Sequence, residues 1–248
     1  TVNHSIVIDF SKYMHDVVEI NSEEKWVRTQ PGVTIDELNR QLSSTGLFFT
    51  PDPSTSSRAN IGGAMGNNSC GAHSIIYGKT VDQVKEMSVV LSDGSRAQFE
   101  QLSANMLDSK LKLSTLEAQI YNRVNDIARN AAVEVDKRFP KILRRVGGYN
   151  LDLIQNSEAL NLAKLMVGSE GTLVAVTESK LNLVPVPKVK GLAVLHFKDI
   201  ISAMEATVAT LEQNPAAVEH MGDLVRVLPV DAVECQLREA GGEHRVGL

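Results

Sequence analysis

The sequence predicts an α+β fold in which mixed sheets are flanked by helices. Short apolar runs of strand length at 17–20 and 25–28 are separated by a polar hairpin loop. Other stretches carry apolar residues at helical spacing, and 116–131 is the clearest of them. Two glycine-rich segments, 51–79 and 167–174, follow neither pattern. Long irregular segments inside a folded domain usually bind something, so these two are the candidates for function.

The composition is that of an ordinary globular protein, and it excludes one class of partner. The 248 residues allow one large domain or two modest ones, and 43% apolar with 22% charged residues is a usual balance. The net charge of −5 provides no basic footprint for nucleic acid. A site for an anionic ligand must therefore be local, built from backbone N–H groups and a few cations.

Cysteine usage and the chain ends narrow the class further. Cys70 and Cys235 are the only cysteines and neither lies in a CxxC motif, which excludes a disulfide framework and a four-cysteine metal site. We expect no metal site. No apolar run is long enough to span a bilayer, and the first residues do not form a signal peptide. Both ends look cut, which predicts a fragment of a longer protein.

The first elements follow in order from local signals. A buried strand is predicted at 6–8 and a hairpin at 17–28. Thr34, with Glu37 three residues later, forms a capping box that starts a helix, and Gly46 ends that helix. The apolar stripe of this helix consists of Ile35, Leu38 and Leu42.

Strands and helices continue on both sides of the first glycine-rich segment. The predicted strands are 47–49, 87–91, 96–99 and 172–184, and the predicted helices are 116–131 and 160–167. Asp93-Gly94 is a hairpin turn between the second and third of these strands. Gly168 ends the second helix and opens the second glycine-rich segment.

A domain boundary is predicted at the end of this pattern. Pro185 and Pro187 resist both a helix and a central strand. We therefore expect one domain at 1–187 and the beginning of another at 188–248. The second contains a predicted strand at 192–197, a helix at 200–211 and a strand at 216–219. This order resembles the beginning of a split ferredoxin-like unit.

Two common nucleotide-binding motifs fail at single positions. Gly78 and the following Lys-Thr end like a Walker A loop, but the first glycine of that motif would have to stand at His73. Gly62 and Gly63 suggest a Rossmann fingerprint, but its first position is Ile61 and no buried strand precedes it. A P-loop and a Rossmann fold are therefore disfavoured.

Four motifs occur in one order along the chain: PDPSTSSRANIGGAMGNNSCG, YGKTVDQV, RRVGGYNLDLI and VGSEGTLVAVTESKLNLVPVP. From about Val2 to Pro187, the sequence closely resembles the FAD-linked oxidase domain of the vanillyl-alcohol oxidase superfamily. It looks most like D-lactate, glycolate and D-2-hydroxyglutarate dehydrogenases with a C-terminal iron–sulfur half. The resemblance implies a PCMH-type FAD-binding domain that lacks its first glycine-rich phosphate turn, followed by the beginning of a substrate or cap domain.

The resemblance also implies that both glycine-rich segments bind FAD. The implied cofactor-binding residues are Pro51, Asp52, Pro53, Ser54, Thr55, Ser57, Arg58, Ile61, Gly62, Gly63, Gly66, Asn67, Asn68, Ser69, Tyr77, Gly78, Glu170, Gly171, Thr172 and Val176. Residues 52–58 would line the flavin and pyrophosphate, and 170–176 would close over the adenine and ribose. Glycines would let backbone N–H groups approach the cofactor, because they lack a Cβ. The alternative is that these are ordinary turns.

The function implied is oxidation of a small 2-hydroxy acid by hydride transfer to flavin N5. An iron–sulfur or quinone acceptor in the full-length protein would take the electrons. The catalytic residues are unknown and expected in the missing cap, since His196 and His220 are isolated. A cytoplasmic location is expected, with peripheral membrane association as an alternative. The other class left open is a non-catalytic nucleotide-binding or scaffold domain, the fragment itself being inactive.

Some residues of the motifs have two readings each. Cys70 and His73 are candidates for covalent flavin attachment, although a buried thiol and a polar loop residue are favoured. Tyr77 either packs against the flavin or is a core aromatic residue. Arg144 and Arg145 either face the cofactor or substrate, or form a solvated basic helix end, which is favoured.

Overall fold

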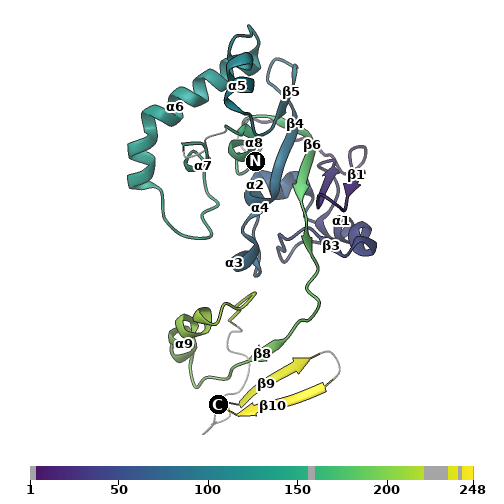
Figure 1. Cartoon of the computed structure of the whole chain (residues 1–248), viewed down its shortest axis with the longest axis vertical. Coiled ribbons are helices and arrows are strands. Elements are labelled where there is room, and N and C mark those ends of the chain that lie inside the picture. The colour runs from purple at the N-terminus through teal and green to yellow at the C-terminus, as the bar shows by residue number, and fades with distance from the viewer. Residues whose placement is uncertain (1–3, 156–159, 221–233, 240–241, 248) are drawn as a thin grey trace. The chain divides into compact units, whose positions relative to one another are not determined.

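Antiparallel strands and separate helices make up the chain, which confirms the predicted α+β class (Figure 1). The structure is a computed structural model that describes residues 4–155, 160–220, 234–239 and 242–247. The chain divides into two units, Thr1–Val184 and Pro185–Leu248. We describe each unit by itself.

A five-stranded antiparallel sheet organises the first unit, with the strand order β1-β2-β6-β4-β5. Its strands are β1 (Val17–Asn21), β2 (Trp26–Thr29), β4 (Val84–Val90), β5 (Arg96–Phe99) and β6 (Ala175–Asn182). Both predicted hairpins are present, and Gly94 adopts a φ of +82° in the second. The last strand in sequence, β6, pairs with β2 and β4 at the middle of the sheet. The second glycine-rich segment therefore leads directly into the sheet centre.

The first predicted strand, at 6–8, is wrong. These residues belong to no strand, and Ile6 and Val7 are 90% and 74% exposed. Three apolar residues do not hold a strand by themselves, because a strand is stabilised by hydrogen bonds to a neighbour. None of the described strands pairs with this segment.

The first helix, α1 (Ile35–Leu42), begins and packs as predicted. The hydroxyl of Thr34 accepts a hydrogen bond from the backbone N–H of Glu37 at 3.3 Å. The reciprocal half of the capping box is not used, because the Glu37 carboxylate accepts bonds from Arg40 and Gln41. The stripe of Ile35, Leu38 and Leu42 is buried. A short 3₁₀ turn, η1 (Ser43–Thr45), precedes Gly46 and then β3 (Leu47–Phe48).

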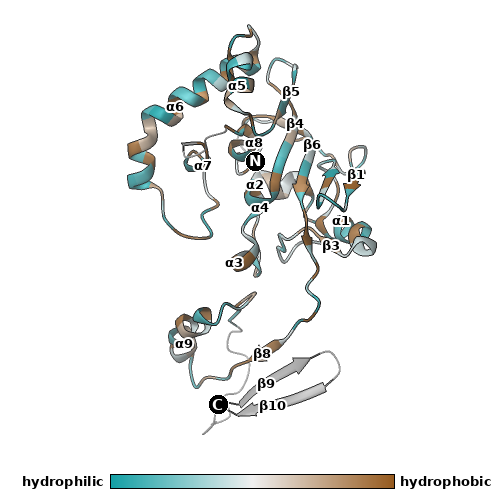
Figure 2. Ribbon diagram, viewed as in Figure 1, coloured by the Kyte–Doolittle hydropathy of each residue, from teal (hydrophilic) through white to brown (hydrophobic). Residues whose placement is uncertain are grey.

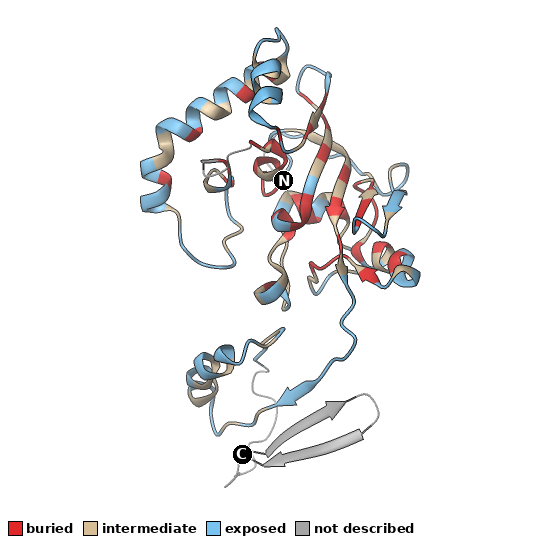
Figure 3. Cartoon of the chain, in the orientation of Figure 1, coloured by how far each residue is buried: buried red, intermediate tan, exposed pale blue. Residues whose placement is uncertain are grey.

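The helices α5 (Ala104–Leu111) and α6 (Leu116–Arg138) follow β5 in sequence. The sequence reading missed α5 and ended α6 too early. Hydrophilic and hydrophobic residues are mixed along α6 (Figure 2). Only a few residues of α6 are buried. Most buried residues lie on the sheet, α1, α2 and α8 (Figure 3). Ile127, which has an apolar side chain within the predicted helix at 116–131, is exposed, whereas Tyr121 is buried.

A three-residue ion cluster joins three strands of the sheet. The Glu86 carboxylate on β4 accepts hydrogen bonds from Lys180 Nζ on β6 at 2.8 Å and from Arg28 Nη2 on β2 at 3.2 Å. Lys180 Nζ also lies 4.4 Å from the centroid of the Trp26 ring. Burial raises the pKa of Glu86, but the bonds and charges of Lys180 and Arg28 together hold it below its ordinary value.

We expect Glu86→Gln to destabilise the first unit by about 1–2 kcal/mol near neutral pH, because two half-buried cations lose their counter-charge. The pKa of Glu86 is lowered in the folded state, so its stabilisation is present above the ordinary pKa and disappears as the pH falls through the folded value. Urea unfolding from about pH 7 to pH 3 should give a flatter stability profile for the variant. Glu37→Gln, which breaks an exposed ion pair, is the control. Equal losses in both variants would contradict this assignment.

The described residues of the second unit form one helix and a three-stranded antiparallel sheet. The helix is α9 (Ile200–Glu212), and the sheet order is β10-β9-β8. Its strands are β8 (Leu192–Val194), β9 (Glu234–Glu239) and β10 (Gly242–Gly247). The strand predicted at 216–219 is wrong, since these residues pair with no described strand. A ferredoxin-like completion of this unit stays a prediction.

Candidate functional site

The first glycine-rich segment is more regular than predicted. It contains the short helices α2 (Ile61–Asn67) and α3 (Ser74–Tyr77), and α4 (Thr80–Gln83) follows it. The side chain of Asn60 caps α2 by accepting a hydrogen bond from the backbone N–H of Gly63 at 2.7 Å. Ile61, Ala64 and Met65 bury one side of α2 in the core. This capping and burial outweigh the weak helix propensity of the glycines.

Two of the predicted phosphate-binding N–H groups have protein partners. The Gly62 N–H donates to the Pro31 carbonyl at 2.8 Å, and the Gly63 N–H donates to Asn60. A Cβ on Gly62 would lie 2.8 Å from the Pro31 Cβ, so this glycine is required by close packing. A contact between these two N–H groups and a cofactor stays a prediction.

The structure places the two glycine-rich segments against each other. The Gly168 N–H donates to the Met65 carbonyl at 2.8 Å, and the Glu170 N–H donates to the Gly66 carbonyl at 3.0 Å. Helix α8 (Leu162–Met166) ends immediately before this contact. Two backbone hydrogen bonds therefore join the C-terminal half of α2 to the start of the second segment, although about a hundred residues separate them in sequence.

The predicted cofactor-binding residues differ in how accessible they are. Exposed are Ser54, Thr55, Ser57, Arg58, Gly63, Asn67, Glu170, Gly171 and Thr172. Half-buried are Asp52, Pro53, Gly62, Gly66, Ser69, Tyr77, Gly78 and Val176, and buried are Pro51, Ile61 and Asn68. The exposed residues, with three hydroxyls and one guanidinium at 54–58, are those that can reach a ligand without rearrangement.

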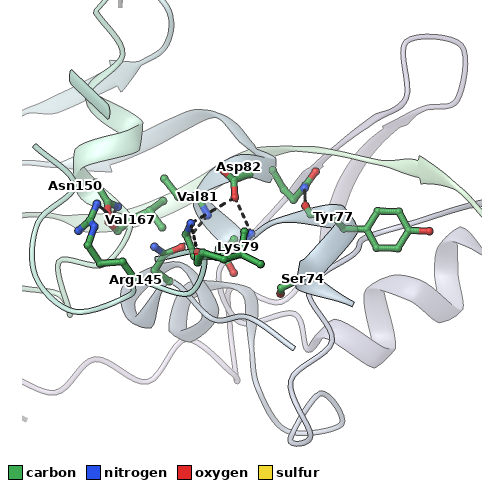
Figure 4. A network of polar contacts seen from close by, with 12 residues as sticks. Ser74, Tyr77, Lys79, Val81, Asp82, Arg145, Asn150 and Val167 are labelled. Atoms are coloured by element: carbon green, nitrogen blue, oxygen red, sulfur yellow. Dashed lines mark hydrogen bonds and ion pairs between the residues drawn. The ribbon is translucent and has the colours of Figure 1, made fainter. Parts of the chain in front are cut away.

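Asn68 is buried, so its side chain serves the fold. It has a φ of +53°, and its Oδ1 accepts a hydrogen bond from the Val81 N–H at 3.0 Å. Its Nδ2 is buried without a hydrogen-bond partner. Lys164 Nζ donates to the Val81 carbonyl at 2.6 Å. Burial lowers the pKa of Lys164, and the nearby Asp82 carboxylate opposes that shift. Figure 4 shows polar contacts around Val81, Asp82 and Lys79.

A histidine–carboxylate pair, which was not predicted, joins the start of the first glycine-rich segment to a residue near its end. His73 Nδ1 lies 2.5 Å from Asp52 Oδ2, and the His73 N–H donates to Asp52 Oδ1 at 3.4 Å.

Two other residues of the first segment had two readings. The Tyr77 ring packs edge-on against the Phe48 ring, with 5.6 Å between the ring centroids, which makes Tyr77 partly a packing residue. Cys70 is a half-buried free thiol.

Arg144 and Arg145 do not form a solvated helix end, and that favoured reading is wrong. Helix α6 ends at Arg138, before both residues. Arg144 Nη2 donates to the Gly71 carbonyl of the first glycine-rich segment at 2.6 Å. The Arg145 side chain is only 13% exposed and forms an ion pair with Asp152 at 2.5 Å. A charge run in sequence cannot reveal such partners, because they lie outside the run.

The donor set of the site fits FAD. Hydroxyls and a guanidinium at 54–58 suit a pyrophosphate in a chain whose net charge is −5. A Cβ placed on Gly171, where φ is +72°, would meet no atom within 4 Å, so the backbone there is open to a ligand. Among the described residues, no group of three or more His, Cys, Asp or Glu side chains could hold a metal ion. No helix in the described part of the chain could cross a membrane.

Comparison with known proteins identifies the fold and the cofactor. Residues 1–99 match the family described as FAD binding domain. The chain also superimposes on alkyldihydroxyacetonephosphate synthase with a TM-score of 0.53 at 20% identity, over 82% of this chain and 28% of that one. The first unit therefore has the PCMH-type FAD-binding fold, and the predictions of this fold and of FAD as cofactor are confirmed.

Proteins with similar sequences include dehydrogenases and an oxidase subunit. The chain is 35% identical over 220 residues to D-2-hydroxyglutarate dehydrogenase of Escherichia coli (strain K12), covering 88% of this chain and 22% of the relative. The Pseudomonas putida enzyme of the same name is 33% identical over 92% of this chain and 23% of the relative. Glycolate oxidase subunit GlcD of Bacillus subtilis is 30% identical over 78% of this chain and 31% of the relative. The predicted resemblance is confirmed, and the chain spans less than a quarter of these D-2-hydroxyglutarate dehydrogenases.

Proposed function

We propose that this chain is the FAD-binding part of an oxidoreductase that oxidises a small 2-hydroxy acid. The observation that carries the proposal is the hydrogen-bonded contact between the two glycine-rich segments at Gly168–Met65 and Glu170–Gly66. The similarity to D-2-hydroxyglutarate dehydrogenases and to a glycolate oxidase subunit supports the substrate class. Substrates of the D-lactate, glycolate or D-2-hydroxyglutarate type would fit.

The residues of this chain would hold and orient the cofactor. FAD, when bound, supplies a hydride acceptor at N5. The exposed hydroxyls at 54–57 and the Arg58 guanidinium would bind the pyrophosphate through charge-assisted hydrogen bonds. The joined backbone of Gly66 and 170–172 would support the remainder of the cofactor. The groups that bind the substrate carboxylate and take its hydroxyl proton would come from a cap domain beyond this chain.

The electron acceptor and the location belong to the same proposal. One relative, from Saccharomyces cerevisiae, is named D-lactate dehydrogenase [cytochrome] 1, mitochondrial, at 28% identity over 86% of this chain. A separate redox partner is therefore reasonable for the full-length protein, and we propose an iron–sulfur centre or a quinone. We propose a cytoplasmic location, with peripheral membrane association as the alternative.

Flavin binding tests the proposal. We expect the 248-residue chain to bind FAD weakly or not at all and to show no turnover. A chimera extended upstream with the corresponding residues of the E. coli relative should acquire stoichiometric FAD, measured by flavin absorbance after gel filtration. A folded chimera that takes up no FAD would refute the proposal and favour a non-catalytic binding or scaffold domain. If the unextended chain bound stoichiometric FAD, this would refute only the expectation that FAD binding depends on upstream residues.

A further inference from the structure

Residues 143–150 form a strap that touches both glycine-rich segments. On one side, Arg144 Nη2 donates to the Gly71 carbonyl at 2.6 Å, and Lys79 Nζ donates to the Leu143 carbonyl at 3.1 Å. On the other side, the Tyr149 hydroxyl lies 2.9 Å from Thr172 Oγ1. These bonds join three stretches that are far apart in sequence, and one of them reaches the exposed Thr172 of the proposed cofactor site.

Asn150 makes the most buried contact of the strap. It is 1% exposed, and its Nδ2 donates to the Val167 carbonyl at 2.7 Å and to the Lys164 carbonyl at 3.2 Å. Its Oδ1 accepts from Arg145 Nη2 at 3.4 Å (Figure 4). One buried amide therefore satisfies two carbonyls at the C-terminal end of α8, those of Lys164 and of the C-cap residue Val167, where the second segment begins.

Gly168 is the point at which the strap and both glycine-rich segments come together. Its φ is +85°, and a Cβ there would lie 3.4 Å from the Gly148 carbonyl oxygen and 3.6 Å from Asn150 Nδ2 and from Asn68 Cβ. The strap, the second segment and the first segment thus meet around one glycine. Gly147 and Gly148 have open space where a Cβ would lie, but Gly148 adopts a φ of +78°, which favours glycine at this turn of the strap.

We infer that Asn150 is a positioning residue that holds the second glycine-rich segment in register with α2, and that the strap couples the two halves of the cofactor site. The contacts stand by themselves, but the consequence for FAD rests on the proposed function. Asn150 itself is buried and acts through the backbone of 167–172.

Hydrogen exchange of the 248-residue chain tests the positioning role without FAD. In Asn150→Ala, we expect the amides of Gly168 and Glu170 to exchange about tenfold faster, because their bonds to α2 open locally. Amides of β4 and β6 should keep their protection. The control is Asn122→Ala, which removes a similar bond from an asparagine side chain to the Ala118 carbonyl on α6. Unchanged exchange at 168–170, or equally faster exchange throughout the first unit, would overturn the inference.

The extended chimera tests the coupling to FAD. Tyr149→Phe removes only a half-exposed hydroxyl and should fold normally. We expect it to raise the Kd for FAD about threefold, and Asn150→Ala to raise it about tenfold. Wild-type affinity in Asn150→Ala, with faster exchange at 168–170, would overturn the coupling. If the wild-type chimera binds no FAD, the proposed function fails, while the exchange result alone decides the positioning role.

Discussion

Replacement of Gly71 by alanine is expected to disrupt the first glycine-rich segment and to destabilise the first unit by about 1–3 kcal/mol, as overpacking does. An added Cβ would lie 2.0 Å from Asp52 Oδ1 and 2.3 Å from the Asp52 carbonyl oxygen. A backbone oxygen cannot rotate away as a side chain can. The backbone around Asp52 and the backbone around Gly71 must therefore move apart. That movement would break the Asp52–His73 pair and the bond from Arg144 to the Gly71 carbonyl.

The matched control is Gly147→Ala, at a glycine with no atom within 4 Å of the added Cβ. It should leave stability within about 0.5 kcal/mol of the wild type. Urea unfolding at neutral pH gives the stabilities, and FAD titration of the extended chimera gives the consequence for the site. We expect Gly71→Ala to weaken FAD binding by more than about tenfold. Equal stability of the two variants would contradict the close packing of Gly71 against Asp52.

The elements predicted correctly are those with local signals. The hairpin turn at Asp93-Gly94 and the Thr34 cap of α1 each depend on a few neighbouring residues. Helix α2 was missed because its glycines argue against a helix, whereas its Asn60 cap and its buried side chains decide the outcome. The strand at 6–8 was wrong for the opposite reason, since its apolar side chains find no partner strand in the described structure.

The candidate site was predicted from a resemblance between motifs, and the contacts within it were not. Asp52 and His73 are 21 residues apart, and Asn150 and Val167 are 17 apart, with no periodicity that links either pair. Such contacts depend on how the loops close over α2 and α8. The resemblance therefore indicated that both glycine-rich segments belong to one site, while the burial of Asn68 and the partners of Arg145 required the structure.

Asn68 is buried and stabilises the backbone beside the site through its bond to Val81. Replacing Asn68 tests this structural role. We expect Asn68→Ala to destabilise the first unit by about 2–4 kcal/mol, through two effects. The buried Val81 N–H loses its acceptor, which costs about 1–3 kcal/mol. Alanine at a φ of +53° adds about 1 kcal/mol of backbone strain, because asparagine tolerates the left-handed region better.

Asn68→Gly separates these two effects. Glycine accepts the positive φ without strain, but it cannot bond to Val81. If the buried hydrogen bond dominates, the glycine variant should remain at least about 1 kcal/mol less stable than the wild type in urea unfolding. Recovery of wild-type stability would show that backbone strain alone explains the alanine result. Since Asn68 also packs beside Gly168, faster exchange of the Gly168 amide is expected in both variants, and its absence would separate Asn68 from the junction of the two segments.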